Sequence, residues 1–128
     1  MKTTDIFEKH EIEIPSHLIE QVEVPVLTGL QAQGDVIIIP IKPGKITGLE
    51  RVPAEGIAVV RGENGGNTHW LDGGSFAARE NGQSLGTLVV NDNEVAYLTH
   101  TGEHGCNGIG AGFYELRRQR EVGRLVKD

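Results

Sequence analysis

Cysteine, aromatic residues and long apolar runs are all scarce in this sequence of 128 residues. Cys106 is the only cysteine, so no disulfide can form within the chain and a reducing compartment is expected. No apolar run approaches the roughly 18 residues that a membrane-spanning helix needs, and no charged leader precedes an apolar segment. We therefore expect a cytoplasmic protein with no membrane partner.

The sequence also lacks an excess of basic residues, since its formal net charge is -6 at pH 7. A general nucleic-acid-binding protein normally carries a basic surface, so that class is not expected. The charges are unevenly distributed: residues 8–23 hold five glutamates and one lysine, whereas residues 117–127 hold five basic residues and one acid. The basic segment can bind a local anion, or it can pair with the acidic segment of the same chain or of a neighbour.

Glycine, in contrast, is abundant: the 18 glycines are about twice the average usage and indicate many tight turns. Between them lie short segments with alternating or β-branched apolar residues, which are typical of strands. The expected strands are residues 11–15, 21–26, 34–41, 56–62, 68–74, 75–80, 85–90, 95–100 and 112–121. Eight or nine short strands without a long amphipathic helix predict an all-β fold, a small barrel or sandwich. We expect residues 11–128 to form this single domain, with residues 1–10 as a flexible tail.

The segment LTHTGEHGCNG, residues 98–108, places two histidines, a glutamate and the cysteine within seven residues. The two histidines are His100 and His104, and His69 lies near the start of an earlier expected strand. Imidazole is the commonest metal ligand, and neighbouring strands can bring such side chains together. His69, His100 and His104 are therefore candidate ligands of a divalent transition metal.

A carboxylate from Glu103 or Glu63 would complete such a metal site, and a catalytic site would keep one coordination position open. In a loop, however, the spacing of the two histidines in 100–104 fixes no geometry. The simpler interpretation is that the histidines cap turns through hydrogen bonds and that Cys106 fills space beside a glycine. The sequence leaves both interpretations open.

The segment ELRRQRE is expected to continue as a strand, which places alternate residues on opposite faces. Arg118 and Arg120 then share one face, about 7 Å apart along the strand. The planar guanidinium group suits carboxylates and phosphates, so this pair can clamp an anion. Gln119 lies between the two arginines on the opposite face. The alternative is that the arginines form cross-strand ion pairs with glutamates of the N-terminal segment.

Four segments in the order QGDVIIIPI, GNTH, LTHTGEHG and GAGFYELRRQRE resemble a family of small bacterial and phage proteins without an established activity. These proteins share a Gly-Asp-Val-Leu-Leu strand, a Gly-His-Ala-His-like segment, a Leu-Thr-His-x-x-His-Gly segment and a closing Gly-x-Tyr-x-Val-x-Arg-Gln-Arg-Glu strand. The resemblance spans residues 33–121 and implies a site containing Asp35, His69, His100, Glu103, His104, Arg118, Gln119 and Arg120. Asn67 stands where the family has a further histidine, so a metal site here could be one ligand short. Gly110–Gly112 replaces the usual Pro-Pro-Gly.

These observations predict a homo-oligomeric β module that binds a small polar or anionic ligand, including a nucleotide held by a phage-type sequestering protein. Its expected ligand-binding residues are His100, Glu103, Arg118, Gln119 and Arg120. A second hypothesis is a cupin-like metal-dependent enzyme with the three histidines as ligands and the glutamate as a ligand or general base. A third is a structural or protein-interaction domain in which the motifs only hold strands together.

Overall fold

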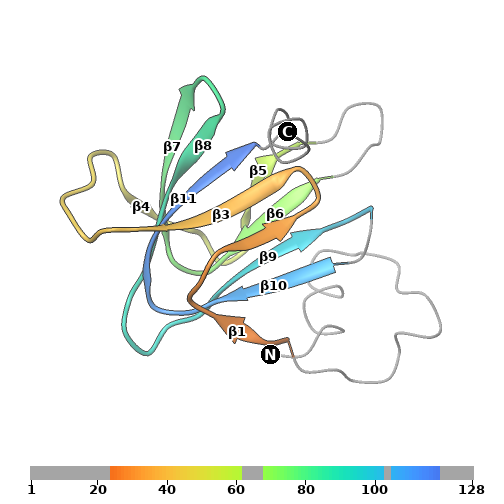
Figure 1. The fold of residues 1–128 in the computed structure, drawn as a ribbon, viewed down its shortest axis with the longest axis horizontal. Helices are drawn as coiled ribbons and strands as arrows, with labels where there is room; N and C mark the ends of the chain where they lie inside the picture. The colour runs from red at the N-terminus through yellow and green to blue at the C-terminus, as the bar shows by residue number, and fades with distance from the viewer. Residues whose placement is uncertain (1–23, 62–67, 103–104, 119–128) are drawn as a thin grey trace, which may run out of the picture.

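The computed structural model describes residues 24–61, 68–102 and 105–118 (Figure 1). These residues form eleven β-strands in two sheets and contain no helix, which confirms the predicted all-β class. The expected tail at residues 1–10 and the expected strand at residues 11–15 lie outside the described part of the chain.

The two sheets have five and six strands. The first has the order β1-β10-β9-β6-β5, and the second has the order β2-β3-β11-β8-β7-β4. The strands are β1 (Val26–Leu27), β2 (Gln31–Gln33), β3 (Val36–Ile41), β4 (Glu50–Arg51), β5 (Ile57–Val60), β6 (His69–Asp72), β7 (Ser75–Asn81), β8 (Ser84–Val90), β9 (Ala96–His100), β10 (Gly105–Ile109) and β11 (Gly112–Arg118). All pairings are antiparallel except that of β1 with β10.

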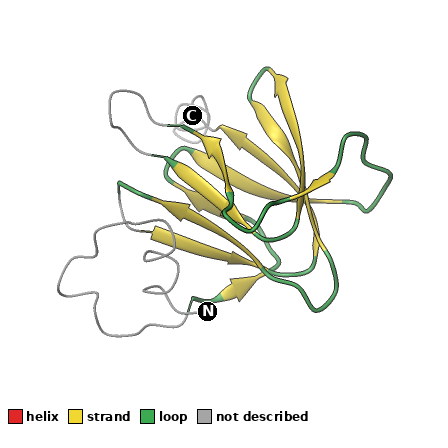
Figure 2. Ribbon diagram, turned by 180° about the vertical axis from the view of Figure 1, so that it is seen from behind, coloured by secondary structure: helices red, strands yellow, loops and turns green. Residues whose placement is uncertain are grey.

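Of the two expected architectures, the sandwich is the one observed. The edge strands are β1 and β5 in the first sheet and β2 and β4 in the second, so the described strands form open sheets rather than a closed barrel. Figure 2 shows the same arrangement from behind, with strands and loops and no helix among the described residues. The described residues include no helix long and apolar enough to cross a membrane.

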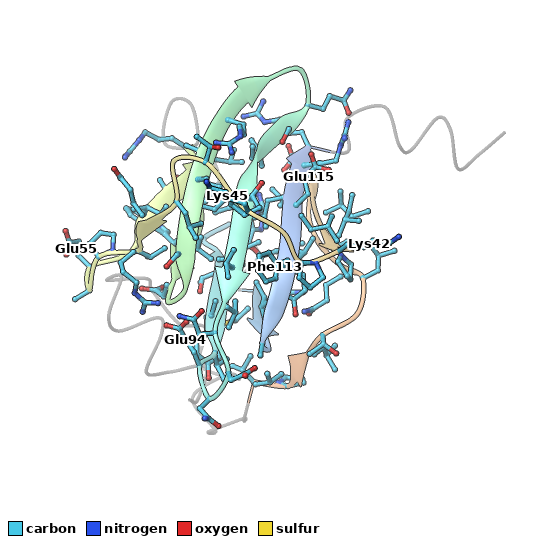
Figure 3. All side chains as sticks on the ribbon, turned by 90° about the vertical axis from the view of Figure 1, so that its left-hand side faces the viewer. Lys42, Lys45, Glu55, Glu94, Phe113 and Glu115 are labelled. Atoms are coloured by element: carbon cyan, nitrogen blue, oxygen red, sulfur yellow. The ribbon has the colours of Figure 1, made fainter. Side chains whose placement is uncertain are left out.

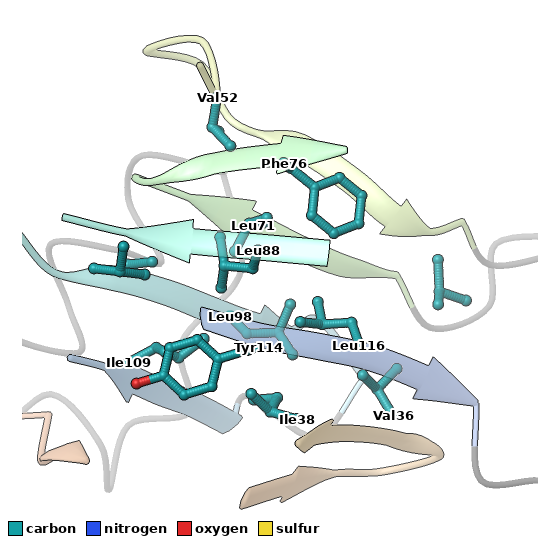
Figure 4. Close-up of a cluster of buried hydrophobic side chains, with 13 residues drawn as sticks. Val36, Ile38, Val52, Leu71, Phe76, Leu88, Leu98, Ile109, Tyr114 and Leu116 are labelled. Atoms are coloured by element: carbon teal, nitrogen blue, oxygen red, sulfur yellow. The ribbon is translucent and has the colours of Figure 1, made fainter. Parts of the chain in front are cut away.

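Apolar side chains from both sheets meet between them and form one core (Figure 4). The core residues are Val36, Ile38, Val52, Val60, Leu71, Phe76, Leu88, Val90, Ala96, Leu98, Ile109, Tyr114 and Leu116. Core residues of one strand are two positions apart, as a pleated strand requires: Val36 and Ile38 in β3, and Ala96 and Leu98 in β9. The one hydroxyl in this core, that of Tyr114, donates a hydrogen bond of 2.7 Å to the Gly110 carbonyl oxygen.

Two hairpins have the same turn. In the β2–β3 hairpin Gln33 pairs with Val36, and in the β7–β8 hairpin Asn81 pairs with Ser84, so each turn has two residues. The first residue of each turn is a glycine with positive φ, Gly34 at 57° and Gly82 at 64°. Such tight turns place the first residue in a conformation that L-amino acids disfavour. Of the two turns, only that at Gly34 lies beside the histidines.

Candidate functional site

Two of the three candidate histidines lie side by side at one end of the sandwich. β6 pairs with β9 so that His69 stands directly opposite His100. The ring centroids are 4.3 Å apart with an interplanar angle of 32°, and the residues are only 1% and 3% exposed. We call His69 and His100 the histidine pair.

The histidine pair continues the inner face of the first sheet. The next pair on the same face of these strands is Leu71 and Leu98, which are fully buried in the core. Because side chains alternate between faces along a strand, the imidazoles point inward like the leucines. The inner face of the first sheet is therefore apolar at Leu71 and Leu98 and polar at the next position, His69 and His100.

The turn between β2 and β3 covers the histidine pair from the second sheet. Asp35 places its Oδ1 3.2 Å from His69 Nε2, while its side chain stays 58% exposed. A Cβ added to Gly34 would lie 3.4 Å from His69 Cε1 and 3.7 Å from the Nε2 atoms of both His69 and His100. A Cβ at this position would therefore be in ordinary van der Waals contact with both imidazole edges, and both Nε2 atoms face the underside of this turn.

Gln33 holds His69 from the other side of the ring. Its Oε1 lies 3.0 Å from His69 Nδ1. Its amide nitrogen donates to the Leu98 carbonyl oxygen at 2.6 Å and to Asn107 Oδ1 at 2.9 Å. Since a primary amide has two N–H groups, these two bonds use both of them and leave Oε1 as the acceptor for His69 Nδ1–H.

The polar contacts continue along β2 and β10 and join the two sheets. Asn107 Nδ2 donates to Gln31 Oε1 at 3.1 Å, and Gln31 Nε2 donates to the Gly108 carbonyl oxygen at 3.0 Å. Gln31 and Gln33 are both buried, and buried amides are costly unless they are hydrogen-bonded. The amides of Gln31, Gln33 and Asn107 therefore form a connected network that fixes the orientation of His69.

Arg118 approaches the same end of the molecule from β11. It pairs with Val36, the residue after Asp35, and shares its face of the strand with the buried Leu116. Its Nε is buried and has no hydrogen-bond partner among the described residues. We call Gln33, Asp35, Arg118 and the histidine pair the polar end of the sandwich.

Arg117 lies on the opposite face of the same strand. Its guanidinium Nη1 is 3.4 Å from Glu115 Oε1, and the two side chains are 42% and 29% exposed. The alternation predicted for this segment therefore holds as far as Arg118. Gln119 and Arg120 lie outside the described residues, as do Glu63, Glu103 and His104.

Cys106 lies on β10 opposite Thr99, away from the histidine pair. Burial is the main cause that raises the pKa of its thiol to about 11, and the Thr99 hydroxyl donates to Sγ at 3.7 Å. A thiol with this pKa stays protonated at neutral pH, so it is neither an activated nucleophile nor a ready metal ligand. No three His, Cys, Asp or Glu side chains in the described part of the chain come close enough together to hold a metal ion.

A surface hollow of about 360 Å³ lies near the start of β11, far along the strand from Arg118. It is formed mainly by apolar residues, including Pro43, Val89 and Phe113, and Asp92 is its one ionisable lining residue. Figure 3 shows Phe113 on this outer face of the second sheet. With a single carboxylate and no basic lining residue, the hollow is poorly suited to bind an anion.

Three side chains of the site, those of Gln31, Gln33 and Asn107, were not among the residues predicted from the sequence. The signal for the two glutamines was available, because QAQ places them two residues apart directly before the Gly-Asp turn. Asn107 has no such signal, since it lies in a Gly-rich segment for which the sequence predicts no strand. In the structure this segment is β10, paired with β9 along its whole length.

The fold and its polar end define an all-β sandwich domain with a buried histidine pair. A family model described as a domain of unknown function, DUF8820, matches residues 32–119. Because the match covers most of the chain, including every residue of the polar end, this chain belongs to that family. No curated protein and no solved structure matches it.

Proposed function

We propose that this protein binds a small anionic ligand at the polar end of its sandwich. The observation that carries the proposal is the position of Arg118, which extends from the inner face of one sheet at the end where the other sheet presents the histidine pair. A fixed positive charge and two imidazoles on facing sheets can contact one ligand from two sides.

The environment of Arg118 favours an anion over a neutral ligand. Its buried Nε has no hydrogen-bond partner among the described residues, so a ligand oxygen can supply one. A guanidinium group binds carboxylate or phosphate oxygens through charge-assisted hydrogen bonds, which are stronger where water is partly excluded. The net charge of -6 opposes binding to a nucleic-acid strand, so a small molecule with one anionic group fits better.

The resemblance to phage proteins supports a nucleotide as the ligand class, held by a sequestering protein rather than converted by an enzyme. A nucleoside monophosphate would place its phosphate at Arg118 and leave its base to other contacts. The homo-oligomeric state and the cytoplasmic location stay predictions.

The test compares two neighbouring arginines on opposite faces of β11. Arg118→Ala should weaken the binding of inorganic phosphate and of a nucleoside monophosphate by about 10- to 100-fold, because a hydrogen bond to a charged group contributes about 1.5–3 kcal/mol. Arg117→Ala removes the same charge from the outer face and should leave binding close to that of the wild type. Isothermal titration calorimetry on metal-free protein measures both. Equal losses in the two variants, or no binding by the wild type, would refute the proposal.

A further inference from the structure

The hydrogen bonds around His69 determine which of its nitrogens carries a proton. Gln33 can only accept from His69, because both of its N–H groups are already donated to Leu98 and Asn107. Nδ1 is therefore the protonated nitrogen of a neutral His69. Its Nε2 then carries a lone pair, and this lone pair faces the Asp35 carboxylate.

Two acceptors held 3.2 Å apart repel each other unless a positive charge lies between or beside them. A proton on Nε2 can supply that charge, and so can a metal ion. The separation itself fits a metal: two ligand atoms about 2.1 Å from one ion, at angles between 90° and 109°, are about 3.0–3.4 Å apart. The observed distance from Nε2 to Oδ1 lies inside this range.

We propose that His69 Nε2 and Asp35 Oδ1 together bind a divalent first-row transition metal ion. A neutral imidazole and a carboxylate suit ions such as Mn²⁺, Co²⁺ and Zn²⁺. This adds a carboxylate ligand, Asp35, that the histidine and glutamate spacing did not indicate. The site adjoins the one proposed for the anion, but metal binding does not depend on that proposal.

The β2–β3 hairpin supplies one of the two ligands, Asp35, and orients the other, His69 of β6. The bond from Gln33 orients the imidazole, as partners of the second ring nitrogen do in metal sites, while Asp35 follows two residues later on the same turn. His100 Nε2 faces the same Gly34 position at 3.7 Å. The described residues contain no group of three His, Cys, Asp or Glu side chains that could hold a metal ion, so the proposed site has two ligands from this part of the chain.

The test rests on Asp35→Asn, which keeps the size of the side chain and removes the charge. The new amide can donate an N–H to His69 Nε2, so the variant needs no cation and should fold at least as well as the wild type. Asp92→Asn makes the same change on an exposed turn residue far from the histidines and serves as the matched control. Co²⁺ is titrated into each protein and followed by its visible absorption and by calorimetry.

We expect the wild type and Asp92→Asn to bind about one Co²⁺ per chain, and Asp35→Asn to bind it at least about tenfold more weakly. In ¹⁵N NMR of the wild type, added Zn²⁺ should shift the His69 Nε2 resonance while Nδ1 keeps its proton. Equal Co²⁺ affinity in wild type and Asp35→Asn, or no Co²⁺ binding at all, would overturn the inference. Phosphate binding by metal-free protein is measured separately, so either proposal can fail while the other stands.

Discussion

Gly34 offers the sharpest test of whether ligands approach the histidine pair beneath the β2–β3 turn. Gly34→Ala places a methyl group 3.4 Å from His69 Cε1 and 3.7 Å from both Nε2 atoms. Gly82→Ala introduces the same methyl at the equivalent position of the β7–β8 turn, where nothing lies within 4 Å. The φ angles of the two glycines are similar, 57° and 64°, so the pair of variants separates backbone strain from what the methyl touches.

Backbone strain should cost the two variants nearly the same stability. An L-residue with positive φ is about 1–2 kcal/mol less favourable than glycine. The contacts at Gly34 are at ordinary van der Waals distances, so they add little to that figure. Both variants should lose about 1–2 kcal/mol in urea unfolding and melt a few degrees below the wild type.

Ligand binding should separate the two variants. The methyl of Gly34→Ala covers the two Nε2 atoms, so Co²⁺ and phosphate should each bind at least about tenfold more weakly, whereas Gly82→Ala should match the wild type. Binding that survives unchanged in Gly34→Ala would mean that ligands do not reach the histidines from beneath this turn. A stability loss in Gly34→Ala several kcal/mol above that of Gly82→Ala would show that the β2–β3 turn packs against the two imidazoles more tightly than these distances indicate.

Three further predictions concern residues around the site and elsewhere in the sandwich. Gln33→Leu should cost about 3 kcal/mol in urea unfolding, because it leaves its three former partners without their hydrogen bonds, and a loss below about 1 kcal/mol would contradict the network. The hydrogen bond from Arg51 lowers the pKa of Glu94 below its usual 4.5, so the stability this pair contributes is present above that value and is lost as the pH falls below it. Glu94→Gln should therefore reduce the dependence of the unfolding free energy on pH in this acidic range. With its pKa raised to about 11, the Cys106 thiol should react with iodoacetamide at pH 8 much more slowly in the folded than in the urea-unfolded protein, and equal rates by mass spectrometry would contradict its burial.

Most of the fold was predictable because strand periodicity is a local signal. The apolar run 34–41 and the segment 95–100 became β3 and β9 almost as expected, since their β-branched and alternating residues fit a pleated surface. β10 escaped notice because GCNGI has little side chain to show alternation. In the structure it pairs with β9 residue by residue, with Ile109 in the core.

The sequence indicated His69 and His100 as candidate site residues, but it did not predict that they lie side by side. His69 and His100 meet because β6 and β9 pair in one particular register, and no local sequence signal fixes the register of strands so far apart in the chain. A shift of either strand by one residue would turn the imidazole of that strand to the outer face and separate the two histidines. The contacts from Gln33 and Asp35 depend on a further event, the packing of the second sheet on the first.

An inner face of β6 and β9 that was apolar along its whole length would need no buried hydrogen-bond partners. The observed face carries His69 and His100 instead, and two buried glutamines, Gln31 and Gln33, together with the half-buried Asn107 support this change. A polar network of this kind adds little stability over a well-packed apolar alternative, and it fixes one orientation of His69. In that orientation Nδ1 donates to Gln33 and Nε2 faces the Asp35 carboxylate. The arrangement places one positive charge, a proton on Nε2 or a bound cation, beside the Asp35 carboxylate, and the Asp35→Asn titration separates these two cases.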